Sequence, residues 1–183
     1  MKRITGIDPS MTGTGIVRMD SWFGDYSFES IRMGSKFEGR EIHNRLKRFI
    51  PFVKEIVKWA LKEDPHLILI EGYSFGSSGQ ATVSIGELGG MLRYELWRKG
   101  YGDVIAEIPP KTLKKFAAQN GNASKEQMED AVWEWWGEEF ESDDEVDAFA
   151  LAQLGRGFFD HLPSPLPQKS FEVVDDVYGV FHG

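Results

Sequence analysis

The sequence predicts an α/β fold with a five-stranded mixed sheet, the first three strands antiparallel, flanked by helices. Three strand-like segments follow one another within the first 33 residues, separated only by short turns. After them, apolar strand-like runs alternate with helical patterns, and a long helical connection precedes the fourth strand. A connection of that length returns the chain for parallel pairing, so one sheet contains both kinds of pairing.

Three strands in a meander are expected at the start of the chain. Residues 3–8 (“RITGID”), 13–19 (“GTGIVRM”) and 26–33 (“YSFESIRM”) have the composition of strands. Pro9 and Gly13 mark the turn between the first two. Strands joined by so short a turn pair antiparallel.

A helical crossover and a buried strand are expected next. Residues 40–62 place apolar side chains at helical spacing, and Pro51 should kink or restart this helix because it has no amide hydrogen to donate. Residues 66–72 (“HLILIEG”) are almost wholly apolar and end in an acid, as in a central strand buried on both faces. After a loop at 73–79, the pattern over 80–99 predicts a second helix.

Three glycines lie within that second helix, at positions 86, 89 and 90. Each costs about 1 kcal/mol of helix stability relative to alanine, so their concentration predicts the close approach of another backbone. Two interpretations of Gly86 and Gly90 stay open: they form part of a dimer interface, or they allow packing within one chain.

The second half of the chain adds one strand and several helices. Residues 103–109 (“DVIAEIP”) predict a fifth strand, and 110–118 a short helix with a proline in its first turn. Ser124 and Gln127 have the spacing of a capping box, which predicts a helix to about residue 136.

The last predicted helix begins at “SDDEVDAFALA” (142–152). Ser142 is expected to cap it with Glu145 at the third helical position, and its acids suit the positive end of the helix dipole. The proline-rich 163–167 breaks the pattern, and 170–182 should form an added strand or a mobile tail. We therefore divide the chain into a domain at 1–160 and a C-terminal tail of unknown role at 161–183.

Composition narrows the class of protein. A chain of 183 residues with 41% hydrophobic residues is long enough for one domain with its own core. It has no cysteine, which excludes a disulfide framework, a thiolate zinc site and a cysteine nucleophile. No apolar stretch has the length of a membrane span, and the first residues lack the apolar core of a signal peptide. We expect no membrane association and a cytoplasmic location.

The net charge of −8 is unevenly distributed. Residues 138–183 contain 11 acidic and 2 basic side chains, so the rest of the chain is close to neutral. The total charge therefore does not exclude nucleic acid as a partner, because basic patches can persist in the nearly neutral part.

Four acids stand out by position. Asp8 ends the first strand, Glu71 ends the fourth, and Asp144 and Asp147 share one face of the last helix. If the first and fourth strands are neighbours, the helix would bring all four together at one end of the sheet. Such a cluster repels itself unless divalent cations compensate the charge, and hard oxygen ligands suit Mg²⁺ or Mn²⁺. Two ions about 3.5–4 Å apart would support hydrolysis of a phosphodiester.

Each acid also has an ordinary explanation. An aspartate before a proline is common in turns, and acids at a helix start commonly serve as caps. It is the conjunction of the four positions that favours a metal site.

Four stretches, in this order and spacing, resemble the RuvC family of Holliday junction resolvases, especially its phage-encoded branch: “GIDPSMTGTGIV” (6–17), “LILIEG” (67–72), “EIPPKTLKKFAAQNGNASKEQM” (107–128) and “DDEVDAFALA” (143–152). The resemblance covers roughly residues 3–157. It implies an RNase H-like nuclease domain at 1–160, a homodimer, and Mg²⁺-dependent cleavage of four-way DNA junctions by paired nicks, in a bacterial or phage-infected cell.

The resemblance also implies roles for particular residues. The four acidic ligands of the family, which hold two metal ions, fall on Asp8, Glu71, Asp144 and Asp147. Its two DNA-contacting lysines fall on Lys114 and Lys125. An aromatic residue of the family acts at the junction centre just after the second ligand, where this sequence offers Tyr73 and Phe75 without deciding between them.

Further lysines lie beside these positions. Lys111 and Lys115 flank Lys114, and we consider two interpretations equally: solvated surface lysines, or contacts to DNA phosphates that position the duplex without reading bases.

Three other functions fit parts of the pattern. An actin-like or sugar-kinase-type ATPase begins with a similar strand, aspartate and glycine-containing turn, but it normally needs a second nucleotide-binding half. A catalytically inactive junction-binding module would lack at least one ligand, and all four are present. An RNase H-like nuclease that acts on other branched or RNA-containing substrates fits the same residues.

Overall fold

The computed structural model of the chain describes residues 1–11, 13–33, 41–73, 80–162 and 166–183. The strands are β1 (Arg3–Asp8), β2 (Thr14–Asp20), β3 (Tyr26–Ile31), β4 (Leu67–Glu71) and β5 (Ile105–Ile108). The helices are α1 (Ile42–Ala60), α2 (Gln80–Leu96), α3 (Pro110–Ala118), α4 (Lys125–Trp136), α5 (Asp143–Gly157) and α6 (Gln168–His182). A π-helical turn (Trp97–Tyr101) and a 3₁₀ turn (Gly102–Val104) connect α2 to β5.

The five strands form one mixed sheet in the order β3-β2-β1-β4-β5. The pairs β1–β2 and β2–β3 are antiparallel, whereas β1–β4 and β4–β5 are parallel. This confirms the predicted mixed sheet with an antiparallel meander. It also satisfies the condition on which the acidic site depends, because the first and fourth strands are neighbours.

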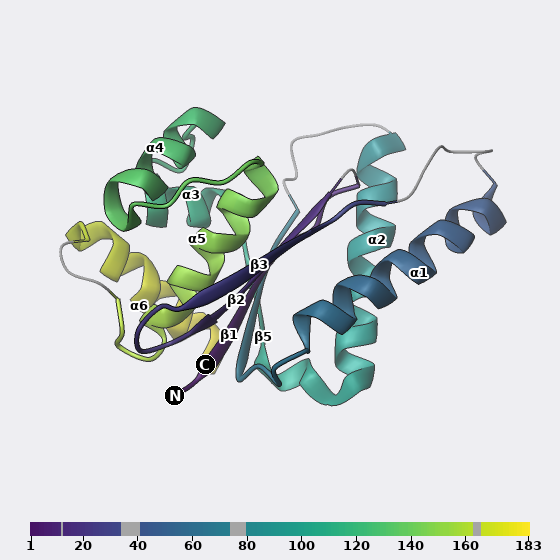
Figure 1. Cartoon of the computed structure of the whole chain (residues 1–183), viewed down its shortest axis with the longest axis horizontal. Helices are drawn as coiled ribbons and strands as arrows, with labels where there is room; N and C mark the ends of the chain where they lie inside the picture. Colours follow the sequence, from purple (N-terminus) through teal and green to yellow (C-terminus); the bar gives the residue numbers. More distant parts are fainter. Residues whose placement is uncertain (12, 34–40, 74–79, 163–165) are drawn as a thin grey trace.

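Helices cover both faces of the sheet (Figure 1). The face covered by α5, with α3, α4 and α6 beyond it, contains Ile4, Leu67 and Leu69 in one buried cluster. The opposite face, covered by α1 and α2, contains Ile7 and Ile68 in a second cluster. Side chains alternate between the two clusters along each strand, as the period of a strand requires.

The position of α5 depends on two glycines inside strands. A Cβ built on Gly6 would lie 2.2 Å from the carbonyl oxygen of Ala148, and one on Gly15 would lie 2.0 Å from that of Asp144. No side chain fits at either position, so the helix backbone packs directly on the sheet. Between Glu145 and Arg156 every residue of α5 is buried except Asp147, which is half-buried.

The C-terminal segment differs from the prediction. Residues Gln168–His182 form a helix rather than an added strand or mobile tail. Ser170, Val173 and Val174 are buried at helical spacing, and the Ser170 hydroxyl donates to the main-chain carbonyl of Phe116 in α3 at 2.8 Å. Val173 and Val174 are β-branched and favour a strand locally, but packing against α3 outweighs that local preference.

Two helix predictions are corrected in part. Pro51 lies inside α1, which continues through it, so of the two predicted outcomes the restart is wrong and the kink stays a prediction. Ser142 occupies the N-cap position of α5, but its hydroxyl makes no capping bond. The Glu145 carboxylate instead accepts a bond from the Glu141 amide at 3.1 Å. The Ser124–Gln127 capping box of α4 is confirmed.

Within the described part of the chain, no helix has both the length and the apolar character required to span a membrane.

Candidate active site

Strand pairing brings Asp8 and Glu71 together. β1 and β4 run parallel, with Ile7 opposite Ile70. The residues that follow on the two strands, Asp8 and Glu71, therefore also lie side by side. By strand alternation, Asp8 follows Gly6 and Glu71 follows Leu69 on the face that α5 covers. Both carboxylates therefore emerge at the same end of the sheet and toward the same helix.

The first turn of α5 adds the other two acids. Because Gly15 pairs with Asp8 and allows the Asp144 backbone to approach, this turn begins over the ends of β1 and β2. Carboxylate oxygens of Asp8, Glu71 and Asp147 all lie within 4.8 Å of one another. Asp144 lies beside this trio, and its negative charge acts on Asp8. The structure thus brings together all four acids that the sequence singled out.

Burial and mutual repulsion raise the pKa values of the whole group. Asp8 is 7% exposed, and burial first, then the negative charge of Glu71, raises its pKa well above the ordinary value. Burial raises the pKa of Asp147 to about 7, with Glu71 adding to the effect and Lys114 opposing it. Burial also raises the pKa of Asp144, and that of Glu71 despite its hydrogen bond to Asp8. Carboxyl groups held this way bind protons in place of a compensating cation.

The donor set fits a hard divalent cation. It consists of carboxylate oxygens from three separate elements, which is the ligand type that Mg²⁺ and Mn²⁺ prefer. Burial, followed by mutual repulsion, raises these pKa values, and bound cations would compensate the negative charge that both effects disfavour.

Two lysines border the acidic group. The Lys114 ammonium on α3 donates to the carbonyl of Ala123 at 2.7 Å, and its charge acts on both Glu71 and Asp147. Lys125, at the start of α4, is exposed and forms an ion pair with Asp143, which raises the pKa of Lys125. The Ala123 carbonyl therefore holds Lys114 close to the carboxylates, and Asp143 does the same for Lys125.

A cleft of about 360 Å³ joins these groups. Glu71, Asp147, Lys114 and Lys125 all line it, together with Asp143. The cleft places the lysines opposite the acidic group. A phosphate could therefore bind between a lysine and a metal ion held by the acids.

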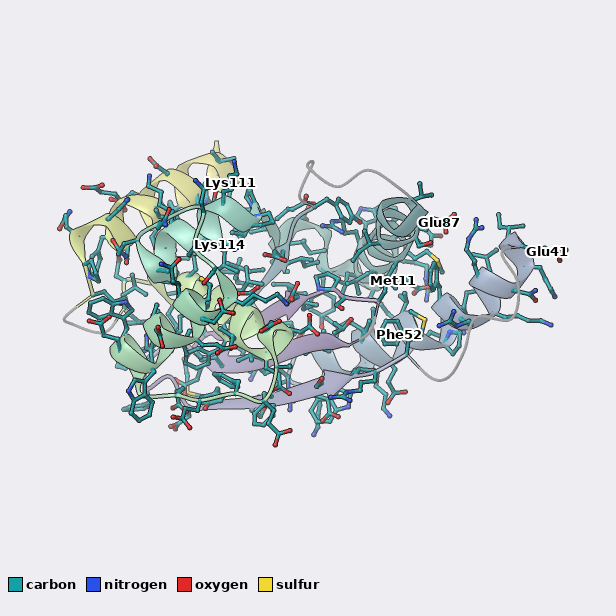
Figure 2. All side chains as sticks on the ribbon, turned by 90° about the horizontal axis from the view of Figure 1, so that it is seen from above. Met11, Glu41, Phe52, Glu87, Lys111 and Lys114 are labelled. Carbon is teal, nitrogen blue, oxygen red and sulfur yellow. The ribbon has the colours of Figure 1, made fainter. Side chains whose placement is uncertain are left out.

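The remaining predicted residues lie in different places. Lys111 is exposed and Lys115 half-buried on α3, and neither lines the cleft. Lys111 and Lys114 lie on the half of the molecule that contains α3, apart from Glu87 on the half that contains α2 (Figure 2). Tyr73 is half-buried against α2, where its hydroxyl contacts the Gly86 carbonyl, and Phe75 lies outside the described residues.

The glycines of α2 are not equivalent. Among the described residues, a Cβ on Gly86 or Gly90 would meet nothing within 4 Å, whereas one on Gly89 would lie 1.9 Å from the Tyr73 hydroxyl. Of the three glycines, Gly89 is thus the one whose place is explained by packing against another described residue of the chain. Gly86 and Gly90 instead line a groove between α1 and α2.

Sequence reasoning missed three residues at this site. Gly15 carried a usable signal, because a glycine inside a strand often marks a close approach. Asp143 was explained as a favourable charge at the helix start, and its pairing with Lys125 depends on α4 lying beside α5. Arg93 of α2, which donates to the main-chain carbonyl of Glu71 at 3.4 Å, had no signal in the sequence.

No protein-family model matches the chain. Curated relatives are nevertheless found. The crossover junction endodeoxyribonuclease RuvC of Brachyspira hyodysenteriae is 26% identical over 147 residues, covering 80% of this chain and 89% of the relative. RuvC of Chlamydia muridarum is 27% identical over 158 residues, covering 81% and 88%.

Solved structures share the fold. Thermus thermophilus RuvC in complex with a Holliday junction substrate matches with a TM-score of 0.65 and 19% identity, over 83% of this chain and 91% of that one. The yeast mitochondrial Holliday junction resolvase Ydc2 matches with a TM-score of 0.55 and 17% identity, over 99% and 83%. The mixed sheet with its flanking helices is therefore the RNase H-like fold of these resolvases.

Proposed function

We infer that this chain is a RuvC-family Holliday junction resolvase, a structure-selective endonuclease that hydrolyses phosphodiester bonds of DNA at four-way junctions. The observation that carries this inference is the meeting of Asp8, Glu71 and Asp147 within 4.8 Å, at the site where the sequence resembles that family. Asp144 completes the acidic group.

Within this function, the four acids are the proposed ligands of two Mg²⁺ ions, with Mn²⁺ as a possible substitute. Bound there, the ions would supply an activated water and stabilise the leaving oxygen of the phosphodiester. Asp8 and Glu71 are fixed by the sheet, and Asp144 and Asp147 by the buried helix α5, so the ligands are held in place before substrate arrives.

The lysines are the proposed DNA contacts. Lys114 and Lys125 border the acidic group and would bind the phosphates on either side of the bond to be cut. Lys111 and Lys115 continue along α3 and would contact the arm of the junction further from the cleft. These contacts position the backbone and carry no base specificity.

We also propose a homodimer, because paired nicks in a four-way junction need two active sites. The groove between α1 and α2 is the proposed interface, and Gly86, Gly90, Leu46 and Tyr94 line it. Tyr94 is 58% and Leu46 39% exposed in the single chain, so a second copy would bury apolar surface there.

The alternatives are tested by substrate. The ATPase interpretation is not favoured, because the relatives and the shared fold both indicate junction resolvases. A related nuclease that prefers other branched or RNA-containing substrates shares the same acidic group, so only a panel of substrates separates it from a resolvase.

We propose the cytoplasm of a bacterial or phage-infected cell as the location, since four-way DNA junctions arise there.

The decisive experiment uses a synthetic four-way junction beside linear duplex and RNA–DNA hybrid. With Mg²⁺ we expect paired nicks in the junction, and none with a chelator. Asp8→Asn and Glu71→Gln should abolish the nicks and keep junction binding. Asp175→Asn, on the exposed surface of α6, is the matched control and should cut normally. Equal cleavage of linear duplex, or nicking that survives in Asp8→Asn, would reject the proposal.

A further inference from the structure

Arg93 of α2 makes three divergent hydrogen bonds at the end of β4. Its Nε donates to the Glu107 carboxylate at 2.8 Å, one terminal nitrogen to the Tyr73 hydroxyl at 3.0 Å, and the other to the main-chain carbonyl of Glu71 at 3.4 Å. The side chain is 22% exposed. One guanidinium thus connects α2 to β5, to the segment after β4, and to the backbone of a proposed metal ligand.

The backbone of Glu71 needs such a partner because the sheet ends there. On one side, the amide of Gly72 donates to the Ile108 carbonyl of β5 at 2.8 Å. On the other side, β1 continues into Pro9, which has no amide hydrogen to extend the ladder. The bond from Arg93 is therefore a side-chain substitute for a strand bond at the position where Glu71 must be held.

Tyr73 is part of the same arrangement. Its hydroxyl donates to the Gly86 carbonyl at 3.2 Å, and its ring lies 4.9 Å from the Arg93 guanidinium carbon. Gly89 makes room for it, because a Cβ there would overlap the Tyr73 hydroxyl. Both polar and apolar parts of Tyr73 are thereby engaged within the chain.

We propose that Arg93 is a positioning residue that fixes Glu71 for metal binding, and that Tyr73 is its support rather than the aromatic that acts at the junction. The metal-binding role of Glu71 rests on the proposed function. Of the two aromatics that the sequence offered, Phe75 is then the remaining candidate for the junction centre.

The planar fork explains why arginine is required. Lysine keeps the positive charge but presents one ammonium, which cannot reach three acceptors in different directions. Arg93→Lys should therefore loosen Glu71 while leaving the charge of the site unchanged. A loosened ligand weakens metal binding and slows the chemical step more than it weakens binding of DNA.

The experiment measures two properties of Arg93→Lys and Tyr73→Phe. The first is Mn²⁺ affinity without DNA, followed by electron paramagnetic resonance of the free ion. The second is junction cleavage, separated into kcat and KM. For Arg93→Lys we expect about fivefold weaker Mn²⁺ binding and about tenfold lower kcat, with KM within about twofold. Tyr73→Phe, which keeps the ring and loses both hydroxyl bonds, should shift both quantities in the same direction by a smaller factor.

Arg98→Lys is the matched control, since Arg98 follows α2 and forms an ion pair with the nearby Glu95 on the surface. It should leave Mn²⁺ affinity and kcat unchanged. Wild-type Mn²⁺ affinity in Arg93→Lys, or an effect no larger than that of Arg98→Lys, would overturn the inference. If Arg93→Lys does not fold, an unchanged Mn²⁺ affinity in Tyr73→Phe has the same consequence.

The metal measurement separates this inference from the proposed function. A wild-type protein that cuts no junction, while Arg93→Lys still weakens Mn²⁺ binding, would reject the resolvase and support the positioning role. Normal junction cleavage by wild type and by Arg93→Lys, with equal Mn²⁺ affinity, would support the resolvase and reject the positioning role of Arg93.

Discussion

Gly15 of β2 lies directly against the first turn of α5, where a Cβ on it would stand 2.0 Å from the main-chain carbonyl oxygen of Asp144. Gly15 is also the partner of Asp8 in the β1–β2 register. The absence of one side chain therefore lets a helix that contains two of the acids begin beside the strand that contains the first. The acidic group depends on this contact as much as on the carboxylates.

Gly15→Ala should accordingly displace the start of α5. We expect a loss of about 1–3 kcal/mol in the free energy of unfolding, from overpacking against backbone, and weaker Mn²⁺ binding. Urea unfolding and Mn²⁺ titration measure the two effects. Gly179→Ala in α6 is the control, since its Cβ would meet no described residue within 4 Å. Equal metal affinity in the two variants would contradict this prediction.

The metal-free protein should lose stability as the pH rises. The pKa of Asp147 is raised from 3.8 to about 7 in the folded state, so between these values the folded chain holds a proton that the unfolded chain has lost. The free energy of unfolding then falls through this window and levels off above it. Saturating Mn²⁺ should raise the melting temperature more at about pH 8 than at about pH 5, because protons compete with the ion for the same carboxylates. An equal increase in melting temperature at both pH values would contradict competition between protons and Mn²⁺ for these carboxylates.

Lys114→Ala should weaken junction binding and flatten its salt dependence. Loss of one phosphate contact lowers the slope of log affinity against log salt by about 1. Fluorescence anisotropy at several salt concentrations measures this slope. Lys58→Ala on α1, where Lys58 is exposed and 4.0 Å from Glu55, removes the same charge away from the cleft and should keep the slope. A slope unchanged in Lys114→Ala would remove Lys114 from the DNA contacts.

A charge placed in the groove between α1 and α2 should separate the proposed dimer. Tyr94→Glu and Leu46→Glu would each put an unpaired carboxylate into the apolar surface of the proposed interface. Sedimentation velocity should show monomers for both variants and dimers for the wild type. Val180→Glu, at a position 86% exposed on α6, is the control and should remain dimeric. Dimers in both groove variants would place the interface elsewhere.

Ser170→Ala should destabilise the fold through α3. The Ser170 hydroxyl is fully buried, donates to the Phe116 carbonyl and accepts a bond from the Gln119 side chain at 2.8 Å. Removing it leaves buried polar groups with fewer partners, at a cost of about 1–3 kcal/mol. Urea unfolding measures this cost. An unchanged midpoint would mean that α6 contributes little to the position of α3 and its lysines.

The sequence by itself determined the five strands, their mixed pairing, and the four acids at strand and helix ends. Those features depend on local pattern: Asp8 and Glu71 each end a strand-like run, and the helical connection between the runs is long enough for a parallel return. The resemblance to a known family then suggested DNA contacts for Lys114 and Lys125, which stay predictions.

Only the tertiary structure decided how these parts are held. The helical state of 168–182 results from packing on α3, against the local preference of its valines. The bonds of Arg93 to Glu71, Tyr73 and Glu107 join residues from three elements. Neither follows from periodicity, because both are contacts between segments distant in the chain. Such contacts stabilise the protein only once the sheet and helices have assembled.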